Sequence, residues 1–279
     1  MVAIPVKPEL DIVNRIYTGY ELEDRKPDIY LGRLGSSFVG EECLRNIWLD
    51  WRGFNRKDFD GRILRLFGTG HWQEDRVVED LKRAGYQVWN KNEHTGKQFE
   101  YADSSKHFVT KIDGIIKGIN GYDDAMLLEI KTHNKKNFDS VVKKGVKSEK
   151  PLHYAQVQIS MNLANFDRAL YLAVCKDDEK LYVEIIERDE IEQEKLFKKV
   201  DKLVAARLRP AGISDDGTSF GCKFCDMKEV CVKNVEPLKN CRTCRQCIPY
   251  TDGTWVCELD SETLPIDKQL TGCEHYEAL

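Results

Sequence analysis

The segment KIDGIIKGINGYDDAMLLEIKTHN, residues 111–134, carries charged side chains where buried strands are expected. Asp113 directly follows an apolar residue, and Glu129 and Lys131 flank Ile130 after the apolar run AMLL. Residues two apart in a strand point to the same face, so Glu129 and Lys131 share a face opposite Ile130.

Two carboxylates at the ends of adjacent strands suit a hard cation such as Mg²⁺ or Mn²⁺. A lysine beside them can orient or deprotonate a water that attacks a phosphate, which is the equipment for metal-assisted hydrolysis of a phosphodiester. The alternative is a surface sheet that carries an ordinary Glu–Lys pair.

Two neighbouring segments add polar residues to this group. GTGHWQE (68–74) places Glu74 in a predicted helix before the strands, with His71 three residues earlier on the same helix face. HYAQVQISM (153–161) places Gln156 and Gln158 in a predicted helix after Lys131.

The elements that would position these residues follow from apolar periodicity, caps and breakers. Residues 1–35 are expected to form an extended arm and entry loop. Helices are predicted over 36–54, 70–85, 151–166 and 188–209, and strands over 86–89, 98–101, 107–112, 115–119, 126–131, 168–175 and 180–187. This order predicts an α/β (α+β) fold in which helices flank a mixed sheet.

Over residues 30–190, these motifs resemble the RecB-like, lambda-exonuclease-like branch of the PD-(D/E)xK nuclease superfamily. The resemblance rests on Gly70 to Glu74, on Asp113 with its following glycine, on Glu129 to Lys131 and on HYAQVQISM. It implies a restriction-endonuclease-like αβββαβ core. It also implies Mg²⁺ or Mn²⁺ at Glu74, Asp113, Glu129 and the carbonyl of Ile130, with Lys131 acting on the water and Gln156 contacting the site.

One departure from this pattern concerns a histidine. Strict RecB relatives carry a histidine where this chain has Glu74, so His71 is expected to be a neighbour of the site or a DNA contact rather than a ligand. Tyr154 could reach the site or simply pack.

Eight of the ten cysteines lie after residue 220, several at CxxC spacing, which favours metal binding over disulfides. Cys222, Cys225 and Cys231 form a C-x2-C-x5-C run, and Cys43 stands alone far upstream. This arrangement resembles the iron–sulfur cysteines of AddB-type and CRISPR-associated RecB-like nucleases, which implies a structural [4Fe–4S] cluster. Tetrahedral Zn²⁺ is the alternative ion, and a buried, unligated Cys43 is the structural alternative.

The last forty residues have the spacing of a small zinc ribbon. Cys241, Cys244, Cys257 and Cys273 are the predicted Zn²⁺ ligands, with Cys247 as a competitor of Cys241 and His275 as a competitor of Cys273. YTDGTW (250–255) predicts a hairpin turn between them. Cys175, in a predicted strand, is expected in the core.

We therefore divide the chain into an arm (1–35), a nuclease core (36–210), an iron–sulfur segment closing onto Cys43 (211–235) and a zinc-ribbon-like tail (236–279). The lysine-rich stretch 134–150 is predicted as a solvated loop that could follow phosphates. The weaker candidates for nucleic-acid contact are His71, Tyr154, Gln158, Lys135, Lys136, Lys143 and Lys144.

Of 279 residues, 41% are hydrophobic and 32% charged, and no apolar run approaches the roughly 18 residues needed to span a bilayer. The start, MVAIPVKPEL, lacks the apolar region of a signal peptide, so a cytoplasmic protein without membrane contact is expected. The formal net charge of −4 gives no global sign of nucleic-acid binding, although a local basic face would suffice.

Together these features predict a metal-dependent DNA exonuclease that acts on single- or double-stranded ends in recombination or repair. By the resemblance named above it could be phage-encoded and act in the host cytoplasm, as an oligomer or with a recombination partner protein. The alternatives are a structure-specific or single-strand endonuclease on the same core, and a non-catalytic DNA-binding or assembly module.

Overall fold

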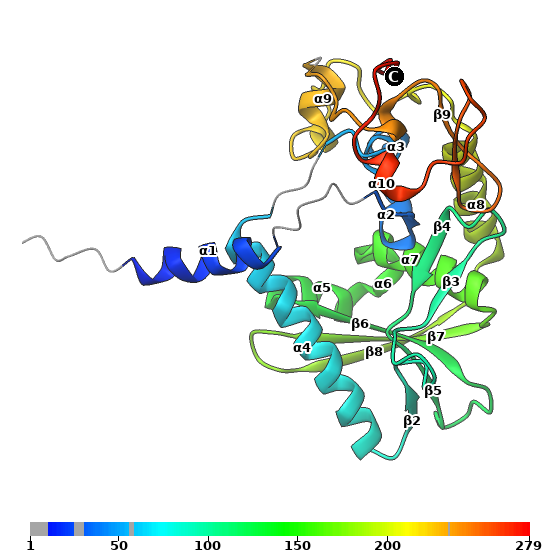
Figure 1. Cartoon of the computed structure of the whole chain (residues 1–279). Coiled ribbons are helices and arrows are strands. Elements are labelled where there is room, and N and C mark those ends of the chain that lie inside the picture. Colours follow the sequence, from blue (N-terminus) through cyan, green and yellow to red (C-terminus); the bar gives the residue numbers. More distant parts are fainter. Residues whose placement is uncertain (1–10, 25–30, 56–58, 234) are drawn as a thin grey trace, which may run out of the picture.

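The computed structural model describes residues 11–24, 31–55, 59–233 and 235–279 (Figure 1). Its centre is a five-stranded sheet in the order β2 (Gln87–Trp89), β5 (Gly114–Lys117), β6 (Met126–His133), β7 (Arg168–Cys175) and β8 (Leu181–Glu187). The β6–β7 pair is parallel and the other pairs are antiparallel. The predicted mixed sheet with flanking helices is thus confirmed.

Helices cover the two faces of this sheet. On one face, Val77 and Val78 of α4 (Gly61–Arg83) pack in one apolar cluster with Leu128 and Ile130 of β6. On the other face, α5 (Lys135–Lys144), α6 (Val146–Glu149) and α7 (Pro151–Ala164) contribute to a cluster that contains Leu127. Because side chains alternate along a strand, Glu129 and Lys131 lie on the same face as Leu127.

A second sheet differs from the predicted core. Strands β3 (Glu100–Ala102) and β4 (Phe108–Lys111) do not join the central sheet but pair with each other and, through β4, with β1 (Leu34–Gly35). A chain of hydroxyls from Ser36 through Thr110 to Ser160, at 2.8 and 2.6 Å, ties this small sheet to α7.

The amino-terminal elements also differ from the prediction. Residues 12–24 form helix α1 (Ile12–Asp24) rather than an extended arm, while positions 1–10 and 25–30 of the predicted arm lie outside the described residues. Helix α1 contacts the start of α4 so closely that a Cβ at Gly61 would lie 2.1 Å from the carbonyl oxygen of Tyr17. Helix α4 begins nine residues earlier than predicted, where the Asp60 side chain accepts a hydrogen bond from Ile63 N at 2.8 Å.

Two further predictions were wrong in detail. The helix predicted over 36–54 is split into α2 (Ser36–Val39) and α3 (Leu44–Trp51). The lysine-rich loop predicted over 134–150 is helical, as α5 and α6. Helix α5 forms because Asn134 caps it and because Phe138 and Val141 supply a buried face.

The cysteine-rich tail packs on the rest of the chain instead of standing apart. It contains short helices η1 (Phe220–Cys222), α9 (Lys228–Val232), η2 (Cys241–Thr243) and α10 (Ile266–Gln269), and the predicted hairpin is present as antiparallel β9 (Cys247–Pro249) and β10 (Trp255–Cys257). Trp255 and Met227 share an apolar cluster with Trp48 of α3 and Leu203 of α8 (Glu190–Ala205). Among the described helices, none is both long and apolar enough to cross a bilayer.

Two buried arginines fix the tail to α3. The guanidinium of Arg52 lies 5.2 Å and that of Arg242 4.6 Å from the ring centroid of Trp255. Arg52 also donates to the carbonyls of Arg242 and Cys247, both at 2.6 Å. The tail therefore shares an apolar core with α3 and α8.

Candidate active site

The first pair of the site lies in the middle of β6. Glu129 is fully buried, and its carboxylate Oε1 lies 2.5 Å from the Nζ of Lys131, whose side chain is 23% exposed. Within the described residues neither oxygen of Glu129 accepts a well-directed hydrogen bond. Burial raises the pKa of Glu129, Lys131 opposes the rise, and Asp113 and Glu74 add to it, so that the resulting pKa is about 7. Burial lowers the pKa of Lys131, but Glu129 and Asp113 outweigh it and the net shift is upward, so the side chain is an ammonium.

Asp113 immediately precedes β5 and reaches the same group. Its Oδ2 accepts a hydrogen bond from the backbone N of Ile130 at 2.7 Å, and Gln98 Nε2 lies 3.5 Å from its Oδ1. Burial raises the pKa of Asp113, while Lys131 and that hydrogen bond oppose the rise. The structure thus joins Asp113 to the strand that carries Glu129 and Lys131.

The third carboxylate comes from helix α4 on the other side of the sheet. Burial raises the pKa of Glu74, the charge of Asp113 adds to the rise, and Lys131 and His71 oppose it. His71 is exposed and interacts electrostatically with both Glu74 and Asp113. The predicted constellation is therefore assembled from α4, the start of β5 and β6.

A cleft of about 520 Å³ opens beside this constellation. One wall is α4, through Glu74, His71 and the residues a turn earlier, and the other is the end of β6 with the start of α5. The lining residues are Leu66, Phe67, Gly70, His71, Glu74, Thr132, His133, Asn134, Asn137 and Lys176. Of the three carboxylates, Glu74 is the one among these lining residues, so the cleft borders the group on the α4 side.

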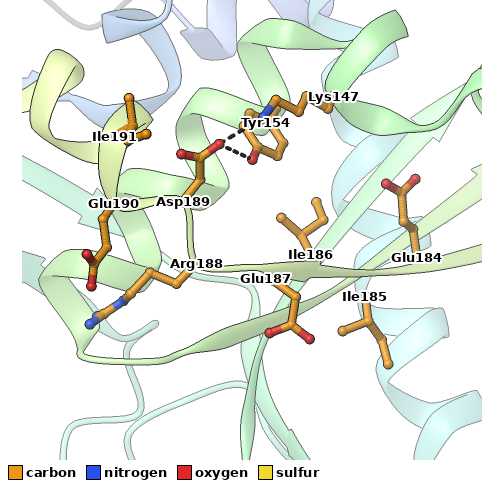
Figure 2. Close-up of a pocket in the computed structure, with 10 residues that line it drawn as sticks. All are labelled: Lys147, Tyr154, Glu184, Ile185, Ile186, Glu187, Arg188, Asp189, Glu190 and Ile191. Carbon is orange, nitrogen blue, oxygen red and sulfur yellow. Dashed lines mark hydrogen bonds and ion pairs between the residues drawn. The ribbon is translucent and has the colours of Figure 1, made fainter.

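Two predicted site residues on α7 are placed elsewhere. Gln158 is fully buried, donates to the carbonyl of Glu187 at 2.9 Å and accepts from Asp189 N at 2.9 Å, so its predicted contact with DNA is corrected to a structural role. The Tyr154 hydroxyl donates to Asp189 at 3.0 Å in a surface pocket that also contains Lys147 (Figure 2). Tyr154 therefore packs.

Gln156 and the predicted lysines of α5 are partly or fully exposed. Gln156 is half-buried on α7, one turn after His153. On α5, Lys136 and Lys143 are exposed, Lys135 pairs with Asp139, and Lys144 pairs with Glu149 at 2.8 Å. Lys135 and Lys144 are thus already engaged in ion pairs on the surface of α5 and α6.

Sequence reasoning missed a cluster next to Lys131. His133 continues the same-face alternation of Glu129 and Lys131, and its Nε2 lies 3.0 Å from the hydroxyl of Tyr171. That hydroxyl also lies 2.8 Å from His153 Nδ1. The alternation of side chains along β6 could have predicted that His133 lies on the same face as Lys131. Tyr171 and His153 join this cluster only through tertiary packing, which no local pattern predicts.

The four cysteines of the predicted iron–sulfur set lie within electrostatic range of one another. Burial raises the pKa of the Cys222 and Cys225 thiols, and the charges of Cys43 and Cys231 raise both further. The first turn of α3 adds polar partners: Asn46 Oδ1 accepts from the Cys225 thiol at 3.3 Å, and Arg45 donates to Cys231 Sγ at 3.6 Å.

In the predicted zinc set, Cys241 lies within electrostatic range of the other three cysteines. The pKa of the Cys241 thiol is raised by burial and then by Cys273, Cys244 and Cys257. The competitor Cys247 is buried beside Cys257, its partner in the β9–β10 register, and burial raises its pKa to about 12. His275 is exposed, 3.7 Å from Glu274.

The donor types in these three groups fit their predicted ions, because mutually repelling carboxylates or thiolates are relieved by a cation. In the described parts of the chain, no three or more His, Cys, Asp or Glu side chains are arranged so that they could hold a metal ion as they stand. Binding would therefore draw these side chains toward a common point.

No protein-family model matches the sequence, and no curated protein matches it. Among solved structures, an alkaline exonuclease (LHK-Exo) from Laribacter hongkongensis is similar at 17% identity and a TM-score of 0.44, covering 67% of this chain and 91% of that one. The structure of the same protein in complex with dAMP is similar at 17% identity and a TM-score of 0.44, covering 69% of this chain and 91% of that one. A protein named SSO0001 is similar at 13% identity and a TM-score of 0.47, covering 79% of this chain and 96% of that one. At these values the likeness is partial, so function is inferred from this chain's own residues.

Proposed function

We propose that this protein is a divalent-metal-dependent deoxyribonuclease of the PD-(D/E)xK type that hydrolyses phosphodiester bonds at DNA ends. The observation that carries the proposal is the electrostatic coupling of Glu74, Asp113 and Glu129 with the Lys131 ammonium, next to an open cleft that Glu74 lines. A purely structural ion pair needs one carboxylate, whereas this group gathers three, partly buried and repelling one another.

Glu74, Asp113 and Glu129 would hold Mg²⁺ or Mn²⁺, with the carbonyl of Ile130 as a further ligand. When bound, the ion supplies Lewis acidity at the scissile phosphate and lowers the pKa of a ligated water. The Glu129 carboxylate holds the Lys131 ammonium in place, and the ammonium in turn stabilises negative charge on the phosphate oxygens. Because the pKa of Lys131 is raised, Lys131 acts as a donor that orients water rather than as a base.

Gln156 is proposed to contact the bound strand from α7, and His71 to contact DNA from α4. The exposed Lys136 and Lys143 would contact phosphates beyond the cleft, with Lys135 and Lys144 available once their surface ion pairs open. Linear ends, single- or double-stranded, are the proposed substrates. We further propose that the protein acts in the cytoplasm, either as an oligomer or together with a recombination partner protein.

The cysteines would stabilise the fold. A [4Fe–4S] cluster, or Zn²⁺ in its place, would link Cys43 to Cys222, Cys225 and Cys231 and so join the two ends of the chain. A Zn²⁺ ion held by Cys241, Cys244, Cys257 and Cys273, with Cys247 or His275 as substitute ligands, would tie the tail together.

The test is product analysis on end-labelled linear DNA and on covalently closed circular DNA, with Mg²⁺, Mn²⁺ or EDTA. We expect metal-dependent release of 5′-phosphorylated nucleotides from linear DNA and no cutting of circles, with the activity abolished by Lys131→Ala. Cutting of closed circles would instead establish an endonuclease on the same core. Inactivity of folded, metal-loaded protein would leave the DNA-binding or assembly module.

A further inference from the structure

A fixed histidine stands at the end of the catalytic strand. His133 is 6% exposed, and its ring stacks on that of His153 at a centroid distance of 5.6 Å and an angle of 15°. The fully buried Tyr171 places its hydroxyl between them, 3.0 Å from His133 Nε2 and 2.8 Å from His153 Nδ1. The ring of His133 is therefore held both by stacking and by a hydrogen bond.

This histidine also borders the cleft. His133 lines the cleft together with His71 and Glu74 and lies on the same face of β6 as Lys131. Since Nε2 is engaged by Tyr171, Nδ1 is the polar atom that the ring can still offer. Nδ1 has no hydrogen-bond partner in the part of the chain that the structure describes. A histidine that only filled the core would not need to border the cleft.

The bridge by Tyr171 links the protonation sites of the two rings. A phenol has one proton to donate, so if Tyr171 donates to His133 Nε2 it must accept from His153 Nδ1–H. In that arrangement His133 carries its proton on Nδ1 and is a donor. In the reverse arrangement Tyr171 donates to His153, and Nδ1 of His133 is an acceptor. An anionic ligand in the cleft selects the first arrangement.

Both rings are neutral at physiological pH. Burial, with the charges of Lys150 and Lys131, lowers the pKa of His133 to about 4. Burial, with Lys131 and His133, lowers the pKa of His153 to about 3. A neutral donor can hold a phosphate oxygen without adding a positive charge beside the Lys131 ammonium.

We propose that His133 is a substrate-contact residue whose Nδ1–H donates a hydrogen bond to a phosphate oxygen of the DNA strand in the cleft, and that Tyr171 and His153 are positioning residues that set its orientation and tautomer. This inference rests on the proposed nuclease function and adds a contact to the same site.

The first test reads the tautomers directly. Long-range ¹H–¹⁵N spectra of the full-length protein, labelled at histidine, are recorded in EDTA with and without a short single-stranded oligonucleotide, and His133→Gln and His153→Gln assign the signals. We expect the oligonucleotide to move both rings to the Nδ1–H tautomer, and Tyr171→Phe to uncouple the two rings. A His133 that stays in the Nε2–H form, or whose signals do not respond to DNA, overturns the proposal.

The second test separates binding from turnover. We expect His133→Leu to raise KM about tenfold or more, because a hydrogen bond to a charged group is lost, while kcat falls less. His133→Gln should recover part of the affinity through its amide donor, and the buried His107→Gln serves as a control, with rates expressed per folded protein. Unchanged KM in His133→Leu overturns the contact even if the wild type is an active nuclease. An inactive wild type with DNA-responsive His133 signals overturns the nuclease function and supports the contact.

Discussion

Glu129 and Lys131 form an ion pair of 2.5 Å in which the carboxylate is fully buried and the ammonium is 23% exposed. Two further carboxylates, Asp113 and Glu74, act on the same pair and raise the pKa of Glu129. One cation therefore balances three acids. The excess of buried negative charge destabilises the metal-free fold and is the physical basis of the proposed metal affinity.

Removal of one acid should stabilise the metal-free protein while it abolishes activity. In Asp113→Asn the amide oxygen can still accept from Ile130 N, and one repulsive charge is lost. We expect the free energy of unfolding in EDTA to rise by about 1 kcal/mol, read from urea denaturation. A matched substitution of the exposed Asp123→Asn should change it little. A loss of stability in Asp113→Asn would contradict the repulsion.

The raised pKa of Glu129 predicts a pH dependence. The folded protein keeps this proton up to about pH 7, whereas the unfolded chain releases it near 4.5. The contribution of this group is thus fully present below pH 4.5 and is lost as the pH rises to about 7, on the order of 3 kcal/mol. His133 and His153, whose pKa values are lowered to about 4 and about 3, give the opposite slope between about pH 3 and 6.5.

Because these slopes oppose each other, the informative quantity is the difference between wild type and Glu129→Gln in EDTA. We expect the stability of the wild type relative to the variant to decrease from pH 4.5 to 7. Parallel stability curves over this range would show that the carboxyl of Glu129 titrates normally.

Arg52 should be required for the docking of the tail. Arg52→Met removes the guanidinium that donates hydrogen bonds to the backbone carbonyls of Arg242 and Cys247. We expect a loss of about 3 kcal/mol in unfolding free energy and faster labelling of the buried thiols Cys244 and Cys247. The exposed Arg65→Met is the control, and equal labelling rates in the two variants would contradict the role of Arg52.

The two sets of cysteines predict two separable metal contents. Cys43→Ser should remove iron, or zinc if that ion occupies the site, while the metal of the tail is retained; Cys241→Ser should do the reverse. Elemental analysis and visible absorption of anaerobically purified protein measure both, with the buried Cys175→Ser as control. Unchanged metal in Cys43→Ser would leave Cys43 as a packing residue.

How much of this could be predicted depends on whether a local pattern encodes it. Asp113, Glu129 and Lys131 could be found because strand alternation sets their faces, and Cys43 because the C-x2-C-x5-C run lacks a fourth thiol. The order of helices and strands around the central sheet was likewise encoded by local periodicity.

The rest depends on contacts between distant segments. The stack of His133 on His153 forms because α7 lies over β6 and β7. No local sequence pattern predicts this packing of distant segments. The path of the tail depends on the place of Trp255 between Arg52 and Arg242. Helix α5 was missed for a different reason, since its many lysines concealed the spacing of Phe138 and Val141.

The most direct test of the central claim is the initial rate of nucleotide release from linear DNA by Glu129→Gln and by Glu187→Gln, with Mn²⁺ and with EDTA. Glu187 lies exposed on the same sheet, in β8, and is the matched control. We predict that Glu129→Gln loses about 100-fold or more of the metal-dependent rate, while Glu187→Gln keeps it. Equal rates in the two variants would show that the buried acids around Lys131 are not the active site.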